Sequence, residues 1–350
     1  MAQRKVPWGR VTAIGTAAVT VPIAAGIASG IAYSALAIDH AVPLPAAVPA
    51  ERRRLPGTAA GAISYYVDES APGRPLVLVH SVNAAASAYE MRPLFEHYRS
   101  RRPVYALDLP GFGFSERSDR TYVPALYVTA LLDLLGEIEP GRGPSDVVAL
   151  SLGSEFAARA ALQQPELVRS LTLISPTGLT ARTQRNRAER ASVSQGRTGP
   201  LQGFLRFPLW SQAVYDLLVS RASLLSFLKM SFVGQPDRGL VEYDYATSHQ
   251  PGARFAPFAF VSGQLFTPDI RQSVYEHLPI PVLALYDQDA FVRFDTLPNV
   301  LARNPNWRAN RIVPTKGLPQ FERLDDTAKA LDTFWQEVGA SQAIGAGERV

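Results

Sequence analysis

Hydrophobic and polar positions along the body of the chain alternate between two periods. Short runs rich in Val, Ile, Leu and Tyr predict strands, and the segments between them carry apolar residues at helical spacing. The expected strands are Ala62–Val67, Pro75–His80, Val104–Asp108, Val147–Ser151, Leu171–Ser175, Val282–Tyr286 and Arg311–Val313. The expected helices are Tyr89–Tyr98, Ala125–Ile138, Gly153–Gln163 and Thr327–Val338. Strands that alternate with helices predict an α/β fold with a mostly parallel sheet and helices on both faces.

The alternation stops once, between residues 181 and 277, where helical stretches follow one another without a clear strand. An all-helical insertion between two sheet strands is typical of a cap. We therefore expect an α/β core formed by residues 57–180 and 278–340, a helical cap formed by residues 181–277, and a short tail at residues 341–350.

The amino-terminal part of the chain has a different pattern. A basic start, residues 1–10, precedes residues 11–38, which carry no charged side chain. A helix of this length would span roughly 40 Å, enough to cross a bilayer, so we expect a transmembrane anchor. The alternative is a secretory signal sequence, cleaved at the A-x-A pattern of residues 35–37, that releases a secreted protein.

Basic residues flank residues 11–38 on both sides, and the nearer, amino-terminal group favours an extracytoplasmic location for the large domain. Prolines among alanines predict an extended linker over residues 39–56. The folded body is then expected to begin near Gly57.

The composition argues against several classes of binding site and of catalytic site. The formal net charge is +4, much of the basic excess lies before the body, and no basic stripe is interleaved with aromatic residues. We therefore expect no nucleic-acid partner. The chain has no cysteine, which excludes disulfides, thiolate ligands and a cysteine nucleophile. Because its 5 histidines are scattered, we expect neither a metal nor another cofactor, and the oligomeric state stays open.

Five short segments of the body contain sequence motifs. They are Pro75–His80, Leu107–Ser115, Val147–Gly153, Pro281–Asp289 and Leu318–Glu322. In this order they resemble motifs of the α/β-hydrolase superfamily: the strand before the oxyanion loop, the D-x-x-G-x-G-x-S loop, the nucleophile elbow, the strand that delivers the acid, and the segment after the catalytic histidine. The resemblance covers about residues 60–338 and implies an α/β-hydrolase fold with a helical cap.

The resemblance implies a serine nucleophile at Ser151. The sharp strand-to-helix turn of an elbow needs small residues two positions away on each side, and Ala149 and Gly153 meet this need. The resemblance also implies that Asp289 is the acid. The competing interpretations are a serine that only caps the following helix and an aspartate that only forms a turn with its own backbone.

The oxyanion donors in this fold are two backbone N–H groups, which the resemblance places on Val82 and Leu152. The histidine departs from the pattern, because Gly317 stands at its position and no histidine follows His277. A serine hydroxyl is a poor nucleophile without a base. An active enzyme would need a substitute, and the candidates are His80, His249 and Lys316.

The cap sequence is rich in large apolar side chains, among them Phe204, Phe207, Trp210, Tyr215, Phe227, Phe232, Tyr243 and Phe258. Those that do not form the core of the cap would line a pocket above Ser151 for an apolar or lipid-derived ligand. Two functions stay open. One is a membrane-tethered serine esterase or lipase-like hydrolase of apolar esters. The other is a degenerate hydrolase that binds an apolar ligand or a protein partner without turnover.

Overall fold

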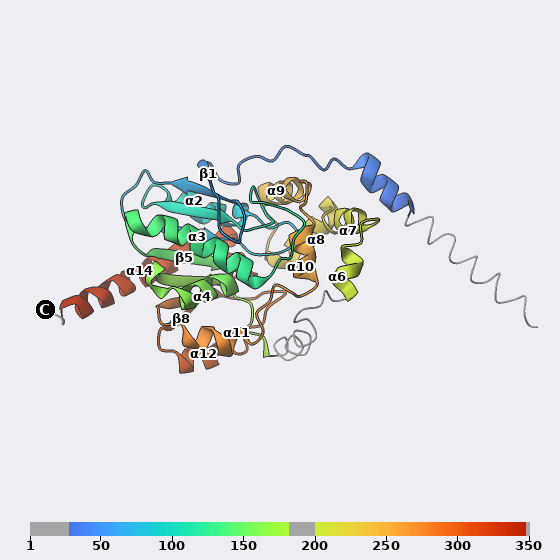
Figure 1. Ribbon diagram of the computed structural model, residues 1–350. Helices are drawn as coiled ribbons and strands as arrows, with labels where there is room; N and C mark the ends of the chain where they lie inside the picture. Colours follow the sequence, from blue (N-terminus) through green and yellow to red (C-terminus); the bar gives the residue numbers. More distant parts are fainter. Residues whose placement is uncertain (1–27, 182–199, 348–350) are drawn as a thin grey trace, which may run out of the picture.

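The computed structural model describes residues 28–181 and 200–347, with one eight-stranded sheet at the centre (Figure 1). The sheet order is β1-β2-β4-β3-β5-β6-β7-β8. The β1–β2 and β2–β4 pairs are antiparallel and all other pairs are parallel, which confirms the expected sheet. The strands are β1 (Glu51–Leu55), β2 (Ile63–Asp68), β3 (Leu76–Val79), β4 (Val104–Asp108), β5 (Ser145–Leu150), β6 (Val168–Ile174), β7 (Val282–Tyr286) and β8 (Trp307–Arg311).

Helices cover both faces of the sheet, because successive strand residues point to opposite faces. Val147 of β5 belongs to a buried cluster that includes residues of α3, α4 and α12, and its neighbour Val148 belongs to a second cluster with α2 and α14. The helical segments of the core are η1 (Ala88–Met91), α2 (Arg92–Tyr98), α3 (Pro124–Arg142), α4 (Gly153–Gln163), η2 (Pro165–Leu167), α12 (Leu297–Arg303), α13 (Pro319–Glu322) and α14 (Leu324–Gly347).

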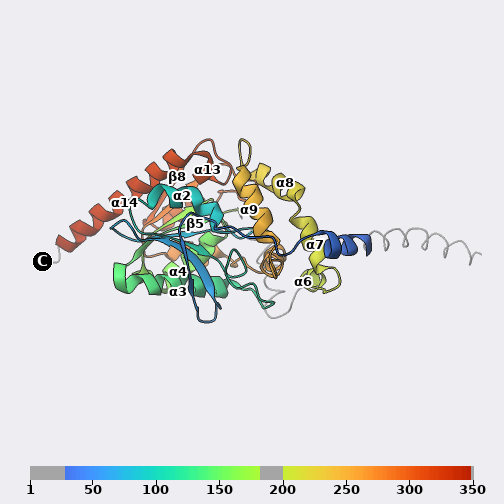
Figure 2. The same ribbon diagram turned by 90° about the horizontal axis from the view of Figure 1, so that it is seen from above.

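The cap lies over the carboxyl ends of the parallel strands (Figures 1 and 2). Its described part, residues 200–277, contains no strand, in agreement with the expected helical insertion. Tyr215 and Phe258 of the cap pack against Ala85 after β3, and the Tyr215 hydroxyl donates to the carbonyl of Ala84 at 2.8 Å. The cap elements are α6 (Pro200–Leu205), α7 (Ser211–Leu218), α8 (Arg221–Ser231), α9 (Arg238–Ser248), α10 (Phe255–Val261), α11 (Ile270–Ser273) and η3 (Tyr275–His277).

Two expectations at the edges of the sheet are wrong. The expected linker, residues 39–56, contains β1, which pairs with β2 along its whole length, so the folded body begins before Gly57. The last strand is Trp307–Arg311, not Arg311–Val313. The cause is the same at both edges. β1 has no buried residue and β8 buries only Trp307, so backbone pairing holds these strands and no apolar run marks them.

The expected membrane segment is only partly within the described residues, because residues 11–27 lie outside them. Residues 28–37 are helical, and Ser34 donates to Asp216 of α7 at 2.5 Å. His40 contacts the same carboxylate at 3.0 Å, so this amino-terminal helix is held on the cap. No helix in residues 28–181 or 200–347 is both long and apolar enough to cross a membrane.

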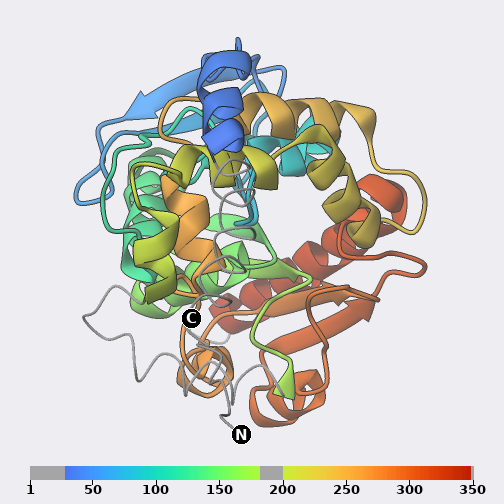
Figure 3. The same ribbon diagram turned by 90° about the vertical axis from the view of Figure 1, so that its right-hand side faces the viewer.

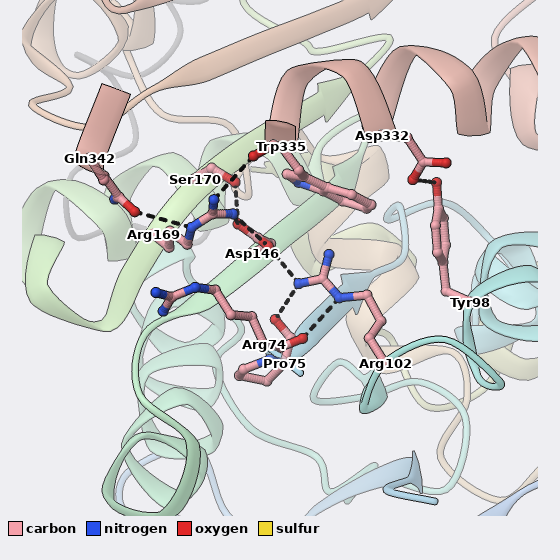
Figure 4. A network of polar contacts seen from close by, with 10 residues as sticks. All are labelled: Arg74, Pro75, Tyr98, Arg102, Asp146, Arg169, Ser170, Asp332, Trp335 and Gln342. Carbon is pink, nitrogen blue, oxygen red and sulfur yellow. Dashed lines mark hydrogen bonds and ion pairs between the residues drawn. The ribbon is translucent and has the colours of Figure 1, made fainter. Parts of the chain in front are cut away.

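A buried ion network ties the sheet together at its amino-terminal end (Figure 4). Asp146 of β5 accepts hydrogen bonds from Arg102, Arg169 and the hydroxyl of Ser170. Arg169 also donates to the carbonyl of Trp335 in α14 at 3.1 Å. Because the network joins β5, β6, α14 and the loop before β4, it holds the strands whose opposite ends carry the candidate site.

Candidate active site

The turn between β5 and α4 has the geometry of a nucleophile elbow. Ser151 has φ +51°, in the left-handed region that non-glycine residues rarely occupy. A Cβ at Gly153 would overlap the carbonyl oxygen of His80, so only glycine fits there. Ser151 is half-buried, and its hydroxyl makes no hydrogen bond with any described residue. This side chain does not cap α4, so the helix-cap interpretation fails.

The two expected oxyanion donors lie beside this turn. The loop after β3 reaches the elbow at the contact between His80 and Gly153, and Val82 follows on that loop. Val82 and Leu152 are buried. Within the described part of the chain, neither of their backbone N–H groups donates to an acceptor. An oxyanion hole needs backbone N–H groups without an acceptor, so both residues remain candidates for that role.

Asp289 lies at the carboxyl end of β7 with one oxygen held and one oxygen free. Its Oδ1 accepts from the backbone of Phe291 at 2.7 Å and of Val292 at 3.0 Å, so it does form the local turn. Its Oδ2 accepts no hydrogen bond from a described residue, and a Cβ at Gly317 would lie 3.1 Å from it. Burial raises the pKa of Asp289 above its ordinary value. The acid position and the position of the absent histidine are therefore neighbours.

The backbone conformation of the loop at position 317 favours glycine. Gly317 has φ +110°, a conformation that a residue with a side chain rarely adopts. Asp287 accepts from the backbone N–H of Thr315 at 3.0 Å, and Glu322 accepts from that of Lys316 at 2.8 Å. Both hydrogen bonds fix the loop just before Gly317, so Asp287 and Glu322 have structural roles here.

His80 does not have the geometry of a substitute base. Its Nε2 accepts from the backbone N–H of Leu109 at 2.9 Å, which leaves the ring proton on Nδ1 to donate to the carbonyl of Ser81. Burial lowers the pKa of His80 to about 4. Both ring nitrogens are occupied by backbone groups, so this histidine holds the oxyanion loop against the loop after β4.

The other two base candidates have different surroundings. His249 is buried at the end of α9, where it contacts the carbonyl of Tyr245 at 2.7 Å and stacks on Tyr245 and His40. These contacts place it between the cap and the amino-terminal segment, and they do not include the elbow. Lys316 is half-buried beside Gly317, and its ammonium group has no partner among the described residues. Of the three candidates, only Lys316 is adjacent to the residues around Asp289.

A pair of buried carboxyl groups beneath the cap was not found from the sequence. Glu90 of η1 accepts from the backbone and hydroxyl of Ser81 and from the amide of Asn83 at 2.7–2.8 Å. Burial raises the pKa of Glu90 to about 7. Asp244 of α9 is buried with no hydrogen bond to its Oδ1 from the described chain, and burial and the nearby Glu90 raise its pKa well above the ordinary value.

A second strained serine was also missed. Ser175 follows β6 directly, has φ +44°, and lies next to the elbow, because Leu150 of β5 pairs with Ile174 of β6. Its hydroxyl is buried without a partner in the described residues. The available signal was its place at the carboxyl end of a parallel strand, where ligands of open α/β sheets bind. The described residues contain no cluster of His, Asp and Glu that could hold a metal ion.

Sequence comparisons identify relatives with hydrolytic functions. The model for the Alpha/beta hydrolase family matches residues 76–330. An esterase of Mycobacterium tuberculosis is 36% identical over 121 residues, which cover 34% of this chain and 39% of the relative. A pimeloyl-[acyl-carrier protein] methyl ester esterase of Xanthomonas oryzae is 34% identical over 112 residues, 32% of this chain and 40% of that protein. The chain thus spans less than half the length of these curated relatives.

Solved structures show the same fold at low identity. A probable hydrolytic enzyme of Pseudomonas aeruginosa superposes with a TM-score of 0.65 at 17% identity, over 84% of this chain and 98% of that chain. A bacterial membrane phospholipase A superposes with a TM-score of 0.60 at 20% identity, over 93% of this chain and 98% of that chain. At this identity the likeness concerns the fold.

Proposed function

Because the chain belongs to the alpha/beta hydrolase family, we propose that it is a carboxylic-ester hydrolase with Ser151 as nucleophile. The observation that carries the proposal is the φ of +51° at Ser151. Holding a residue with a side chain in this region costs about 1–3 kcal/mol, and strain of this kind clusters at active sites and ligand clamps. A turn with only a structural role would be more stable with glycine at this position.

Asp289 is our proposed base, acting through a water molecule. Its Oδ1 is fixed by the local turn, and its Oδ2 lies on the side of Gly317, where glycine leaves room for water. Burial raises the pKa of Asp289, which makes its carboxylate a stronger base. The water takes the hydroxyl proton of Ser151 and passes one to Asp289. The resulting alkoxide attacks the ester carbonyl.

The N–H groups of Val82 and Leu152 then hold the oxyanion, and the proton on Asp289 goes to the departing alcohol. A second water hydrolyses the acyl–serine intermediate by the same route. We expect slow turnover, because serine enzymes that lack triad members keep only about 10³–10⁴-fold acceleration over water.

The proposed substrates are esters of apolar acids, held close to a membrane. Support comes from the apolar cap sequence and from relatives named as esterases. The uncharged residues 11–38 support a membrane anchor with an extracytoplasmic domain as part of this proposal, and a secreted form after cleavage is its alternative.

Hydrolysis of p-nitrophenyl esters of increasing chain length tests the proposal with the full chain. We expect turnover that favours longer acyl chains, loss of turnover to background in Ser151→Ala, and a fall of about 10²-fold in kcat in Asp289→Asn. Asp295→Asn, which changes an exposed carboxylate, is the matched control and should keep full activity. Equal rates for the unaltered chain and Ser151→Ala would refute the proposal.

A second candidate function is favoured by the backbone of Gly317. At φ +110° the loop has adapted to a residue without a side chain, as expected of a degenerate hydrolase that binds an apolar ligand without turnover. Saturable binding of a long-chain ester that neither the unaltered chain nor Ser151→Ala hydrolyses would support this function over the first.

A further inference from the structure

The outer surface of the cap carries several exposed apolar side chains. We call the exposed apolar side chains of α6–α8 and their adjoining loops the cap face. α8 has 11 residues and buries only Leu224. Contiguous exposed apolar groups of this kind mark contacts with a partner or a membrane, whereas single ones are ordinary. The most exposed members, each 43–75% accessible, are Leu201, Phe204, Phe207, Leu209, Leu217, Phe227 and Val233.

The exposed large apolar side chains gather at one end of the molecule. Outside the cap they are Tyr33 and Leu36 of the amino-terminal helix, Val123 before α3, Phe291 after β7 and Val313 after β8. All of these positions lie on the cap side, at the carboxyl ends of the strands, which is the end turned toward the viewer in Figure 3. In the described residues, the loops at the amino ends of the strands expose none.

Among the charged residues 200–236, the one that is exposed and has no described partner is a cation. Between residues 200 and 236 the sole acidic residue is Asp216, which is buried and bonded to the amino-terminal segment. Lys229 of α8 is exposed and has no partner among the described residues. The other cations of this stretch, Arg206 and Arg221, pair with carboxylates outside it. The cap face thus keeps one exposed cation without a described partner, Lys229, among apolar side chains, and this combination favours contact with anionic lipid headgroups.

The cap face is continuous with the uncharged amino-terminal run. Residues 28–37 end that run and lie beside α7 in Figures 1 and 2, joined to it by Ser34 and Asp216. The described end of the uncharged run therefore lies next to the cap face.

We propose that the cap face lies on a lipid bilayer that contains anionic headgroups, so that the folded body contacts the membrane in addition to the amino-terminal run. Phe291 and Val313 follow the strands that end near Asp289 and Gly317, so the side of the site formed by β7 and β8 faces the same surface. The proposal does not depend on turnover at Ser151 and can hold for a binding protein as well.

The absence of cysteine allows a direct test with the full chain. Leu217→Cys and Phe227→Cys place a single thiol on the cap face, Leu36→Cys places one on the amino-terminal helix, and Arg74→Cys places one on an exposed loop at the amino ends of the strands. Each variant is labelled with an environment-sensitive fluorophore and reconstituted in vesicles of phosphatidylcholine and phosphatidylglycerol. Quenching by doxyl-labelled phospholipid then reports contact with the bilayer.

We expect blue-shifted emission and loss of most of the intensity at positions 217 and 227, and full intensity at position 74. Quenching at position 36 alone would overturn the proposal, because only the amino-terminal run would then touch lipid. Shielding at positions 217 and 227 that depends on protein concentration and not on lipid would also overturn it, in favour of a second copy on the cap face.

Discussion

Gly317 differs from the histidine of an active triad in two ways: it carries no base, and its φ is +110°. The side chain nearest to it is that of Asp289. We predict that Gly317→His raises ester hydrolysis, because an imidazole beside Asp289 can accept the proton of Ser151. The same change should lower stability by about 1–3 kcal/mol, because a residue with a Cβ is strained at this φ.

Gly317→Ala is the matched control for this experiment. It introduces the same backbone strain without a base, so urea unfolding should show a similar loss of stability and the ester assay no gain. The gain in Gly317→His must vanish when Ser151→Ala is added. If Gly317→His and Gly317→Ala hydrolyse esters equally, the loop does not present the ring to Ser151.

Single residues also show what sequence reasoning could reach. The elbow at Ser151 was predictable, because a small residue on each side and a strand before it are local signals. The bonding of His80 was not predictable, because its partner Leu109 is distant in sequence and only the fold brings them together.

At the scale of elements, the contact of α9 with η1 brings two acids together. Tyr89 stacks on Tyr243 at 4.9 Å, and the same contact buries Asp244 near Glu90. An amphipathic pattern predicts which face of a helix is buried, but it does not predict that a carboxyl group is buried on that face. Strands were predictable where they carry an apolar run. β4 and β7 were predicted to the residue, whereas β1 and β8 lack an apolar run and were missed or misplaced.

This acid pair predicts a stability that falls as the pH rises. The folded-state pKa of Glu90 is raised to about 7, and that of Asp244 is raised well above 3.8. Above the ordinary carboxyl values the native state therefore holds more protons than the unfolded chain, so the free energy of unfolding decreases with pH. For Glu90 this decrease runs from about pH 4.5 to about pH 7.

Asp244→Asn removes one of the two acids and should unfold at a higher denaturant concentration than the unaltered chain at pH 8, with little difference at pH 4. Each unit of raised pKa corresponds to about 1.4 kcal/mol. Asp295→Asn, at an exposed carboxylate, should show no such pH-dependent gain. An Asp244→Asn chain that loses stability equally at both pH values would contradict the assignment of a buried, protonated acid.

In the whole molecule, the candidate site and the buried ion network lie at opposite ends of the sheet. The carboxyl ends carry Ser151, Asp289 and the cap, whereas the amino ends carry the ion network around Asp146 (Figure 4). The fold class followed from the alternation of strands and helices. The gathering of exposed apolar side chains at one end did not, because a sequence shows which residues are apolar but not which of them stay at the surface.

The division between the two ends predicts that stability and site function can be separated. Asp146→Asn should lower the free energy of unfolding by about 3–5 kcal/mol, because it leaves Arg102 and Arg169 without their buried counter-charge. Glu96→Gln, which breaks the exposed pair with Arg92, should cost less than about 0.5 kcal/mol. Below their unfolding transitions both variants should hydrolyse esters at the unaltered rate. Equal unfolding midpoints for the two variants would mean that the network at the amino ends does not hold the sheet, and a selective loss of turnover in Asp146→Asn would mean that the two ends are coupled.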